Sequence, residues 1–141
     1  MDRDHEGGCL CGAVRYRIAA EPTSVAYCHC RMCQRAGGAP VMAWATVPAD
    51  AFAFVRGKPA TYASSTFAER QFCPRCGSPL TFRYRPETGE VDVTVASLDH
   101  PDALPPQYHI WTASRPAWFD TTDSLPRHRE RGPDSPPPHP A

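Results

Sequence analysis

The chain of 141 residues has the length of a single domain, and a hydrophobic fraction of 41% is enough for a buried core. Its 15 basic and 15 acidic residues give a formal net charge of zero, so nothing in the charge balance points to nucleic acid or a membrane surface as a partner. No run approaches the ~20 apolar residues of a membrane-spanning helix, and the polar N-terminus lacks the apolar core of a secretory signal. We therefore expect a cytoplasmic protein with reduced thiols.

Short runs in which apolar and polar residues alternate, separated by turn residues, predict antiparallel β-sheet with little helix. In chain order, the predicted strands are residues 14–18, 41–47, 52–55, 66–72, 81–84, 91–95 and 108–112. Turns are predicted at 57–59 and 86–89, where Gly and Pro occur together. One short helix is predicted over 31–36, ended by Gly37 and Gly38.

The two ends of the chain differ in composition from the middle. Residues 1–6 are polar and are predicted to be an N-terminal extension. Residues 126–141 hold six prolines and three arginines and almost nothing apolar, which predicts a disordered, partly polyproline-like tail. The folded domain is therefore expected over residues 7–125.

Seven cysteines gather in three clusters along the chain. The clusters are Cys9 with Cys11, then Cys28 with Cys30 and Cys33, then Cys73 with Cys76. An odd number of cysteines in a chain without a secretory signal argues against a disulfide framework. Thiols spaced by one or two residues on a single loop are typical of zinc ligands, so the clusters predict metal binding.

The outer two clusters are predicted to share one ion. A structural zinc ion takes four ligands, so Cys73 and Cys76 need a second pair from elsewhere, while Gly77 frees the backbone to turn back under the metal. Cys9 and Cys11 can supply that pair, and the ion would then join segments that are far apart in the sequence. The spacing alone also allows Cys73 and Cys76 to pair with the middle cluster.

The middle cluster offers three thiolates and leaves one coordination position open, as catalytic zinc sites do. The alternatives are a distant fourth ligand, His109 or His100, and an iron–sulfur cluster. A soft ligand such as an external thiol suits the open position, because zinc binds a thiol as its thiolate. Arg31 and Arg35 lie beside the cluster in the sequence and can offset its negative charge or bind a carboxylate of the ligand.

Three motifs resemble those of the glutathione-dependent formaldehyde-activating (GFA) family. They are Gly8-Cys9-Leu10-Cys11-Gly12, Cys28-His29-Cys30-Arg31-Met32-Cys33-Gln34-Arg35 and Phe72-Cys73-Pro74-Arg75-Cys76-Gly77. The segments Ser97-Leu98-Asp99 and His109-Ile110-Trp111 resemble the C-terminal pattern of that family. The resemblance runs from about Gly7 to Arg127, with all seven family cysteines in place.

The resemblance implies a zinc-stabilised β-tent, in which antiparallel sheets are joined at a structural zinc ion. It implies two ions per chain, a structural one on Cys9, Cys11, Cys73 and Cys76 and an open one on Cys28, Cys30 and Cys33. The implied activity is that of a carbon–sulfur lyase or synthase, which joins glutathione as co-substrate and formaldehyde as S-hydroxymethylglutathione.

Candidate residues for the chemistry follow from their type and position. His29 and His109 are candidates for the proton transfer, and Arg35 is a third candidate catalytic residue. Arg31 and Arg35 are the candidates for binding glutathione. Two other functions stay open: a non-catalytic zinc-binding scaffold, as in the centromere protein V relatives of the same superfamily, and a zinc hydrolase with an unrelated substrate.

Overall fold

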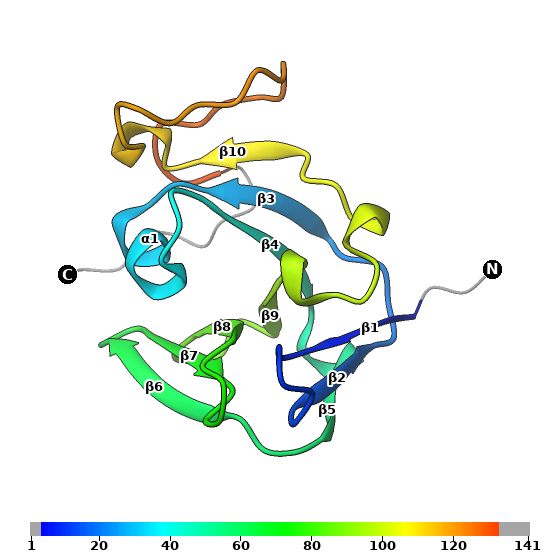
Figure 1. Ribbon diagram of the computed structural model, residues 1–141. Coiled ribbons are helices and arrows are strands. Elements are labelled where there is room, and N and C mark those ends of the chain that lie inside the picture. Colours follow the sequence, from blue (N-terminus) through cyan, green and yellow to red (C-terminus); the bar gives the residue numbers. More distant parts are fainter. Residues whose placement is uncertain (1–3, 133–141) are drawn as a thin grey trace.

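The computed structural model describes residues 4–132, which form two β-sheets and one α-helix (Figure 1). The smaller sheet has the order β1 (His5–Gly8), β2 (Arg15–Ile18), β5 (Phe52–Arg56). The larger sheet has the order β10 (Tyr108–Ile110), β3 (Ser24–Cys28), β4 (Met42–Pro48), β9 (Glu90–Thr94), β8 (Pro79–Tyr84), β7 (Ala68–Phe72), β6 (Ala60–Ser65). The helix is α1 (Arg31–Gly37), and the 3₁₀ turns are η1 (Ala49–Ala51), η2 (Val95–Ser97), η3 (Pro101–Ala103) and η4 (Thr112–Ser114). The predicted mainly β, single-domain fold is confirmed.

The seven-stranded sheet has one face in the protein core and the other turned to a cavity, because side chains alternate along each strand. On β4, Ala45 and Val47 belong to the core, whereas Trp44 and Thr46 line the cavity. In Figure 1 the sheet bends, so that β10, β3 and β4 cross the upper part of the molecule and β8, β7 and β6 the lower part. The helix α1 lies between these two parts.

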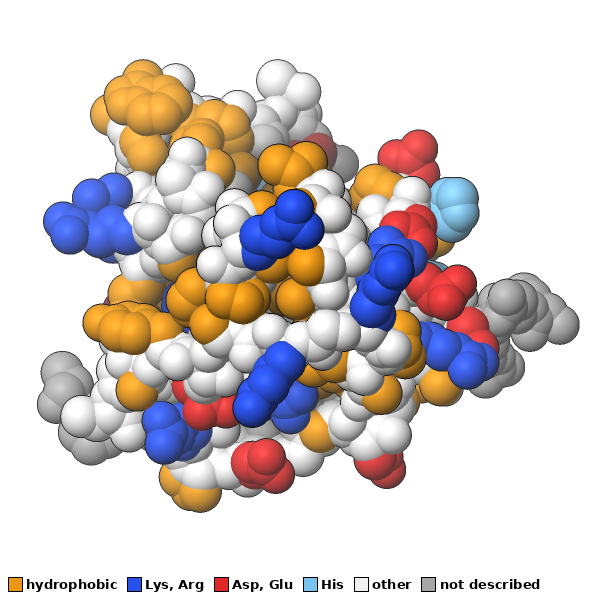
Figure 2. All heavy atoms as spheres, turned by 60° about the horizontal axis from the view of Figure 1, so that its bottom comes forward, with side chains coloured by type: hydrophobic (Ala, Val, Ile, Leu, Met, Phe, Trp, Pro, Cys, Tyr) orange, Lys and Arg blue, Asp and Glu red, His pale blue; other side chains and the backbone are white. Residues whose placement is uncertain are grey.

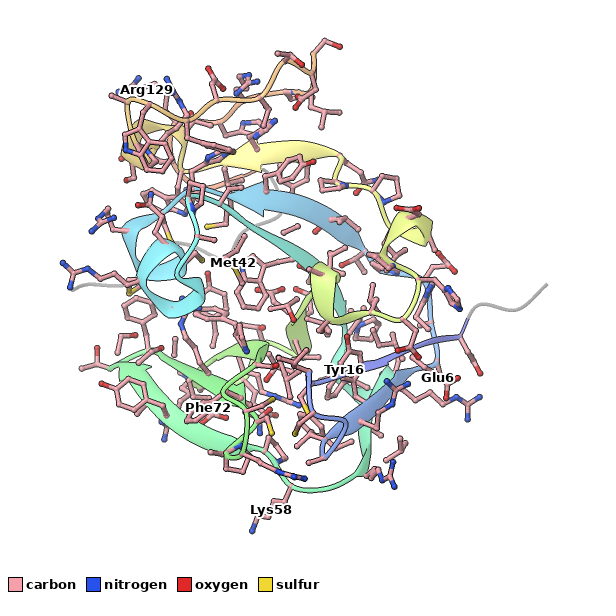
Figure 3. All side chains as sticks on the ribbon, in the orientation of Figure 1. Glu6, Tyr16, Met42, Lys58, Phe72 and Arg129 are labelled. Atoms are coloured by element: carbon pink, nitrogen blue, oxygen red, sulfur yellow. The ribbon has the colours of Figure 1, made fainter. Side chains whose placement is uncertain are left out.

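The main core lies between the two sheets, and Tyr16 of β2 is one of its largest fully buried side chains (Figure 3). Its ring stacks on Phe52, and its hydroxyl is 2.6 Å from the Ser97 hydroxyl. A Cβ on Gly7 would lie 2.6 Å from Cζ of Tyr16, so only glycine lets β1 approach the ring this closely. This contact fixes the small sheet over the core.

Some strands differ from those predicted. Three strands, β1, β3 and β6, were not predicted, and the strand predicted over 66–72 corresponds to β7, which forms a hairpin with β6. Not all pairing is antiparallel, since β10 pairs with β3 in parallel. Parallel pairing is possible here because most of the chain runs between these two strands, so the connection is long enough to bring β10 back in the same direction.

The predicted N-terminal extension and the predicted C-terminal tail each contain residues that pair with a strand. β1 begins at His5, inside the predicted extension 1–6. Residues 126–132, here called the return segment, run beside β10: the His109 N–H donates to the Pro126 carbonyl at 2.8 Å and the Trp111 N–H to the Glu130 carbonyl at 2.8 Å. Composition alone misses this order, because the open backbone edge of β10 supplies the hydrogen bonds. The rest of the predicted tail, residues 133–141, lies outside the described residues.

Charges are mixed on the surface. Figure 2 shows Lys and Arg side chains interspersed with Asp and Glu on the face that is turned forward, as the formal net charge of zero leads one to expect. Within residues 4–132, no helix is both long and apolar enough to cross a membrane.

Candidate functional site

Four cysteines from the first and third clusters meet at the edge of the core. The thiol sulfurs of Cys9, Cys11, Cys73 and Cys76 all lie within 4.8 Å of one another. The Sγ atoms of Cys9 and Cys11 are 3.7 Å apart, and those of Cys11 and Cys73 are 3.8 Å apart. Sulfurs at about 2.3 Å from zinc in a tetrahedron lie roughly 3.8 Å from each other, so this group fits a zinc ion. The open alternative, in which Cys73 and Cys76 join the middle cluster, is not the arrangement observed.

Two similar turns present these cysteines. Gly12 donates its N–H to the Cys9 carbonyl at 3.1 Å, and Gly77 donates its N–H to the Cys73 carbonyl at 2.9 Å. Both glycines have a φ of +81°, a conformation that residues with a Cβ rarely adopt. The two turns differ by one residue in length, but in each the glycine after the second cysteine of the pair donates its N–H back to the carbonyl of the first cysteine.

The middle cluster forms a second group at the start of the helix. Cys28 ends β3, Cys30 is the N-cap of α1 and Cys33 lies in its first turn, with the three sulfurs within 4.8 Å of one another. The Cys33 N–H donates to the Cys30 sulfur at 3.3 Å. No fourth cysteine, histidine or carboxylate of residues 4–132 joins this group, so neither His100 nor His109 is brought to it as a fourth ligand. Three sulfurs with one side free are what the open-site hypothesis requires.

These three thiols favour ionisation at one sulfur. Hydrogen bonds from the Cys28 and Cys33 thiols lower the pKa of the Cys30 thiol to about 3, and the same contacts raise the pKa of Cys28. A guanidinium group from β7 lies beside the trio: Nη2 of Arg70 is 3.9 Å from Sγ of Cys33. The positive charge of Arg70 stabilises thiolate at this end of the site.

A cavity of about 620 Å³ opens beside the three cysteines, within the usual size range for ligand sites. Its walls are mainly apolar and aromatic, with Trp44, Phe82 and Tyr84 among the lining residues. The charged residues on its walls are Arg31, Arg70, Glu90, Asp92, Glu130 and Arg131. An apolar cavity with a few charged groups of both signs suits a zwitterionic organic ligand better than a purely hydrophobic one.

Two polar groups on the cavity wall, a hydrogen-bond donor and a carboxylate, are available to a ligand. The indole N–H of Trp44 is buried and has no hydrogen-bond partner among the described residues. The carboxylate of Asp92 accepts a hydrogen bond from the Thr46 hydroxyl at 2.6 Å. Burial raises the pKa of Asp92 to about 6, against a smaller opposing effect of the Thr46 hydrogen bond. Asp92 is therefore mostly ionised at pH 7, at a cost in desolvation.

The sequence interpretation missed Arg70 and Asp92. The side chain of Arg70 extends over two aromatic rings, with Cζ at 4.9 Å from the ring centre of Phe82 and 5.8 Å from that of Trp44. These cation–π contacts hold the guanidinium group over the cavity. The period-two alternation of the predicted strands 66–72 and 91–95 assigns each residue to a face, but it does not say which strands are neighbours.

The candidate proton-transfer residues lie behind the cysteine loop. His29 and His109 are both fully buried, and the His29 Nε2 is 2.8 Å from the His109 Nδ1. The Nε2–H of His109 in turn donates to the Asp123 carboxylate at 3.0 Å, which assigns the His29 Nε2–H as the donor to His109. Burial is the main reason that the pKa of His29 is lowered to about 4. Neither histidine is among the residues that line the cavity.

The two arginines predicted to bind the ligand have different positions. Arg31 lines the cavity from the first turn of α1. Arg35 is exposed in the last turn of the same helix and is not among the lining residues. A helix turns by 100° per residue, so positions 31 and 35 project one turn apart along its length, and only the first turn reaches the cavity.

Comparisons with known proteins agree with the site. The family model described as "Glutathione-dependent formaldehyde-activating enzyme" matches residues 4–114. A protein of Halomonas elongata named for glutathione-dependent formaldehyde activation is 32% identical over 126 residues, which is 82% of this chain and 79% of that protein. An uncharacterized lyase of Schizosaccharomyces pombe is 36% identical over 81 residues, 57% of this chain. The match spans 58% of the length of the yeast protein.

The fold is also found in a solved structure. A crystal structure of a Rhodobacter sphaeroides protein is similar to this chain with a TM-score of 0.56 and 30% sequence identity. The similarity covers 67% of this chain and 87% of that protein. The family model spans most of the residues that build both cysteine groups and the cavity. The chain therefore belongs to the glutathione-dependent formaldehyde-activating enzyme family.

Proposed function

We propose that this chain is a zinc-dependent carbon–sulfur lyase or synthase that acts on a thiol adduct of glutathione, such as S-hydroxymethylglutathione. The observation that carries the proposal is the position of Cys28, Cys30 and Cys33 on the wall of a cavity large enough for a tripeptide. A structural zinc ion takes four protein ligands, as the four-cysteine group offers, whereas this group offers three. Within this proposal Cys9, Cys11, Cys73 and Cys76 hold a second zinc ion that stabilises the fold.

The reaction is the addition of a thiol to an aldehyde. In the synthetic direction a bond forms between the glutathione sulfur and the formaldehyde carbon, the C=O π bond breaks, and the thiol proton ends on the oxygen. When bound by the three cysteines, a zinc ion would lower the pKa of the substrate thiol. The chain itself would contribute orientation: Cys33 and Arg70 both line the cavity, and we infer that the thiol end of the ligand lies beside them.

Residues of the cavity wall have separate tasks in this scheme. Arg70, held over Trp44 and Phe82, supplies positive charge next to the reacting sulfur. Arg31 offers a guanidinium group at the cavity wall for a carboxylate of glutathione. His29 and His109 support the cysteine loop, because His29 bonds to His109 and His109 bonds to the Asp123 carboxylate. We assign the two histidines this supporting task because they do not line the cavity.

Exchange spectroscopy tests the proposal without the need for a net reaction. Thiols add to formaldehyde unaided, so the measured quantity is the rate of exchange between glutathione plus ¹³C-formaldehyde and S-hydroxymethylglutathione, with and without zinc-loaded protein. We expect faster exchange with the wild-type protein and the uncatalysed rate with Cys30→Ser. Exchange that is equal in the two proteins contradicts the proposal, and full retention of zinc without acceleration favours the scaffold alternative.

A further inference from the structure

A row of five side chains crosses the wall of the cavity, one from each of five neighbouring strands. The pairs that face each other directly are Ser24 with Thr46, Thr46 with Asp92, Asp92 with Phe82, and Phe82 with Arg70. Directly opposite residues on paired strands project to the same face of a sheet. All five line the cavity, so the row places one carboxylate and one guanidinium group on the same wall, separated by the ring of Phe82.

The carboxylate of this row has no cationic partner within residues 4–132. Its Oδ1 accepts from Thr46, and no ion pair of the described residues includes Asp92. Carboxylates that are largely removed from water are normally paired with a cation, because the unpaired charge is costly. Burial accordingly raises the pKa of Asp92, as does the charge of Glu90, and the smaller opposing effects of the Thr46 hydrogen bond and the Arg70 charge do not reverse the shift. Asp92 is therefore a charge that a cationic group of a ligand would satisfy.

The row lies within reach of a ligand that is bound at the cysteines. At one end of the row, Ser24 is four residues, about 13 Å, from Cys28 along β3, and at the other end Arg70 contacts Cys33. Eight bonds separate the thiol sulfur of glutathione from the α-ammonium nitrogen of its γ-glutamyl residue, which is about 10 Å when extended. A glutathione molecule with its sulfur at the cysteines is therefore long enough to bring this ammonium group to the middle of the row, where Asp92 lies between Thr46 and Phe82.

A polar group midway between the two ends supports the same placement. Trp44 is two residues from Thr46 on β4, between the row and Met42, which pairs with Cys28. Its buried indole N–H has no partner among the described residues. A ligand that extends from the cysteines to Asp92 would bring a peptide carbonyl past this donor. The wall thus offers a thiol site, a hydrogen-bond donor and a carboxylate in the order in which glutathione carries its thiol, peptide carbonyl and ammonium group.

We propose that Asp92 is a specificity residue that binds the α-ammonium group of the γ-glutamyl residue of glutathione; this inference rests on the proposed function. The γ-glutamyl residue is the part of glutathione that a simple thiol lacks. Asp92 would thus distinguish glutathione from cysteine, cysteinyl-glycine and small thiols, while the cysteine group alone would bind any of them.

A binding experiment with two proteins and two ligands tests the inference. Isothermal titration calorimetry of the zinc-loaded protein compares wild type and Asp92→Asn, each with glutathione and with glutathione whose α-amino group is acetylated. We expect Asp92→Asn to weaken glutathione binding roughly ten- to hundredfold, because a charge-assisted pair is lost. The acetylated ligand, which has no ammonium group, should bind both proteins equally. Equal loss for both ligands would show that Asp92 only maintains the wall and would overturn the inference.

A matched control is available on the same strand. Glu90 also lines the cavity, but it pairs with Pro48 at the end of β9, outside the row of five side chains, so Glu90→Gln should change glutathione affinity less than about threefold. Thr46→Val removes the hydrogen bond that orients the Asp92 carboxylate and should give an intermediate loss. If wild type binds glutathione and Asp92→Asn binds it equally well, the inference fails and the proposed function stands. If wild type does not bind glutathione, both fail.

Discussion

Arg70 lies with its Nη2 atom 3.9 Å from the sulfur of Cys33, although 37 residues separate the two in the sequence. The guanidinium group reaches this position across the face of Phe82, the residue that pairs with Arg70 on the neighbouring strand. Three thiolates around one Zn²⁺ ion would carry a net charge of −1. Arg70 is the cation that the fold places beside this charge, from a strand that contributes no cysteine.

Replacing Arg70 tests its contribution. Arg70→Met keeps the length of the side chain and its contact with the rings but removes the charge. We expect kcat/KM for the glutathione adduct to fall roughly ten- to hundredfold, the size of a charge-assisted hydrogen bond, with unchanged zinc content. Arg70→Lys keeps the charge without the planar group and should lie between the two. Wild-type kcat/KM in Arg70→Met would exclude a role for this charge.

The two cysteine groups should respond differently to the same substitution. Cys76→Ser removes a ligand that joins two distant segments, and binding energy at such a site is folding energy, so we expect loss of the cooperative thermal transition near the wild-type Tm. Cys30→Ser should stay folded, because serine is a favoured N-cap and can accept the Cys33 N–H as the cysteine does. Its zinc content should fall from about two ions to one per chain. Similar Tm values for the two variants would contradict the division into a structural and an open group.

The sequence predicts those parts of the site whose residues are close together along the chain, and it does not predict the contacts between residues of distant strands. Cys28, Cys30 and Cys33 are close in sequence, so their spacing alone indicated a three-sulfur group, and the glycine after Cys76 indicated its turn. Arg70 and Asp92 become neighbours of the site only through the strand order, and the register near Arg70 is shifted by irregularities on either side of it. Alternation predicts which face a residue occupies, but not the residues it meets there.

The C-terminal part shows the same limit. The composition of residues 126–141 predicted disorder, because the segment has too few apolar side chains to bury. Order up to residue 132 comes instead from backbone hydrogen bonds to β10, which any sequence without proline at the donor positions can form. The contact between Asp123 and His109 could likewise not be read from the residues alone, since both are common types in ordinary surroundings.

The hydrogen-bonded chain from Asp123 through the buried His109 to the buried His29 should hold the return segment against β10. The Thr121 hydroxyl and His109 lower the pKa of Asp123, so the carboxylate is ionised at all pH values at which the thiols could bind zinc. Asp123→Asn removes the charge and weakens the acceptor for His109. We expect the amide protons of His109 and His128, which bond across this pair of segments, to exchange with deuterium at least tenfold faster at pH 7. Wild-type exchange rates of these two amides in Asp123→Asn would show that the backbone hydrogen bonds alone hold the return segment against β10.

The unpaired carboxylate of Asp92 should make the protein less stable as the pH rises. Its pKa in the folded protein is about 6, above the ordinary value of 3.8, because burial disfavours the charge. The folded state therefore binds more protons than the unfolded state between these values, and this contribution to stability is present at low pH and lost as the pH rises through about 6. Asp92→Asn removes the charge, so we expect a higher Tm than wild type at pH 7.5, equivalent to about 1–3 kcal/mol.

The advantage of the same variant should fall to roughly half at pH 5, because Asp92 is then ionised in the unfolded state but mostly protonated in the folded state. Thermal unfolding of both proteins at pH 5 and pH 7.5, each with one equivalent of zinc per cysteine group, measures the difference. Glu90→Gln, which replaces the other carboxylate of β9 on the cavity wall, serves as the control. A Tm difference of equal size at the two pH values would mean that the Asp92 charge is not the cause. A gain that is larger at pH 7.5 than at pH 5, together with weaker glutathione binding, would show that the cavity keeps an ionised carboxylate at the expense of stability because the ligand requires it.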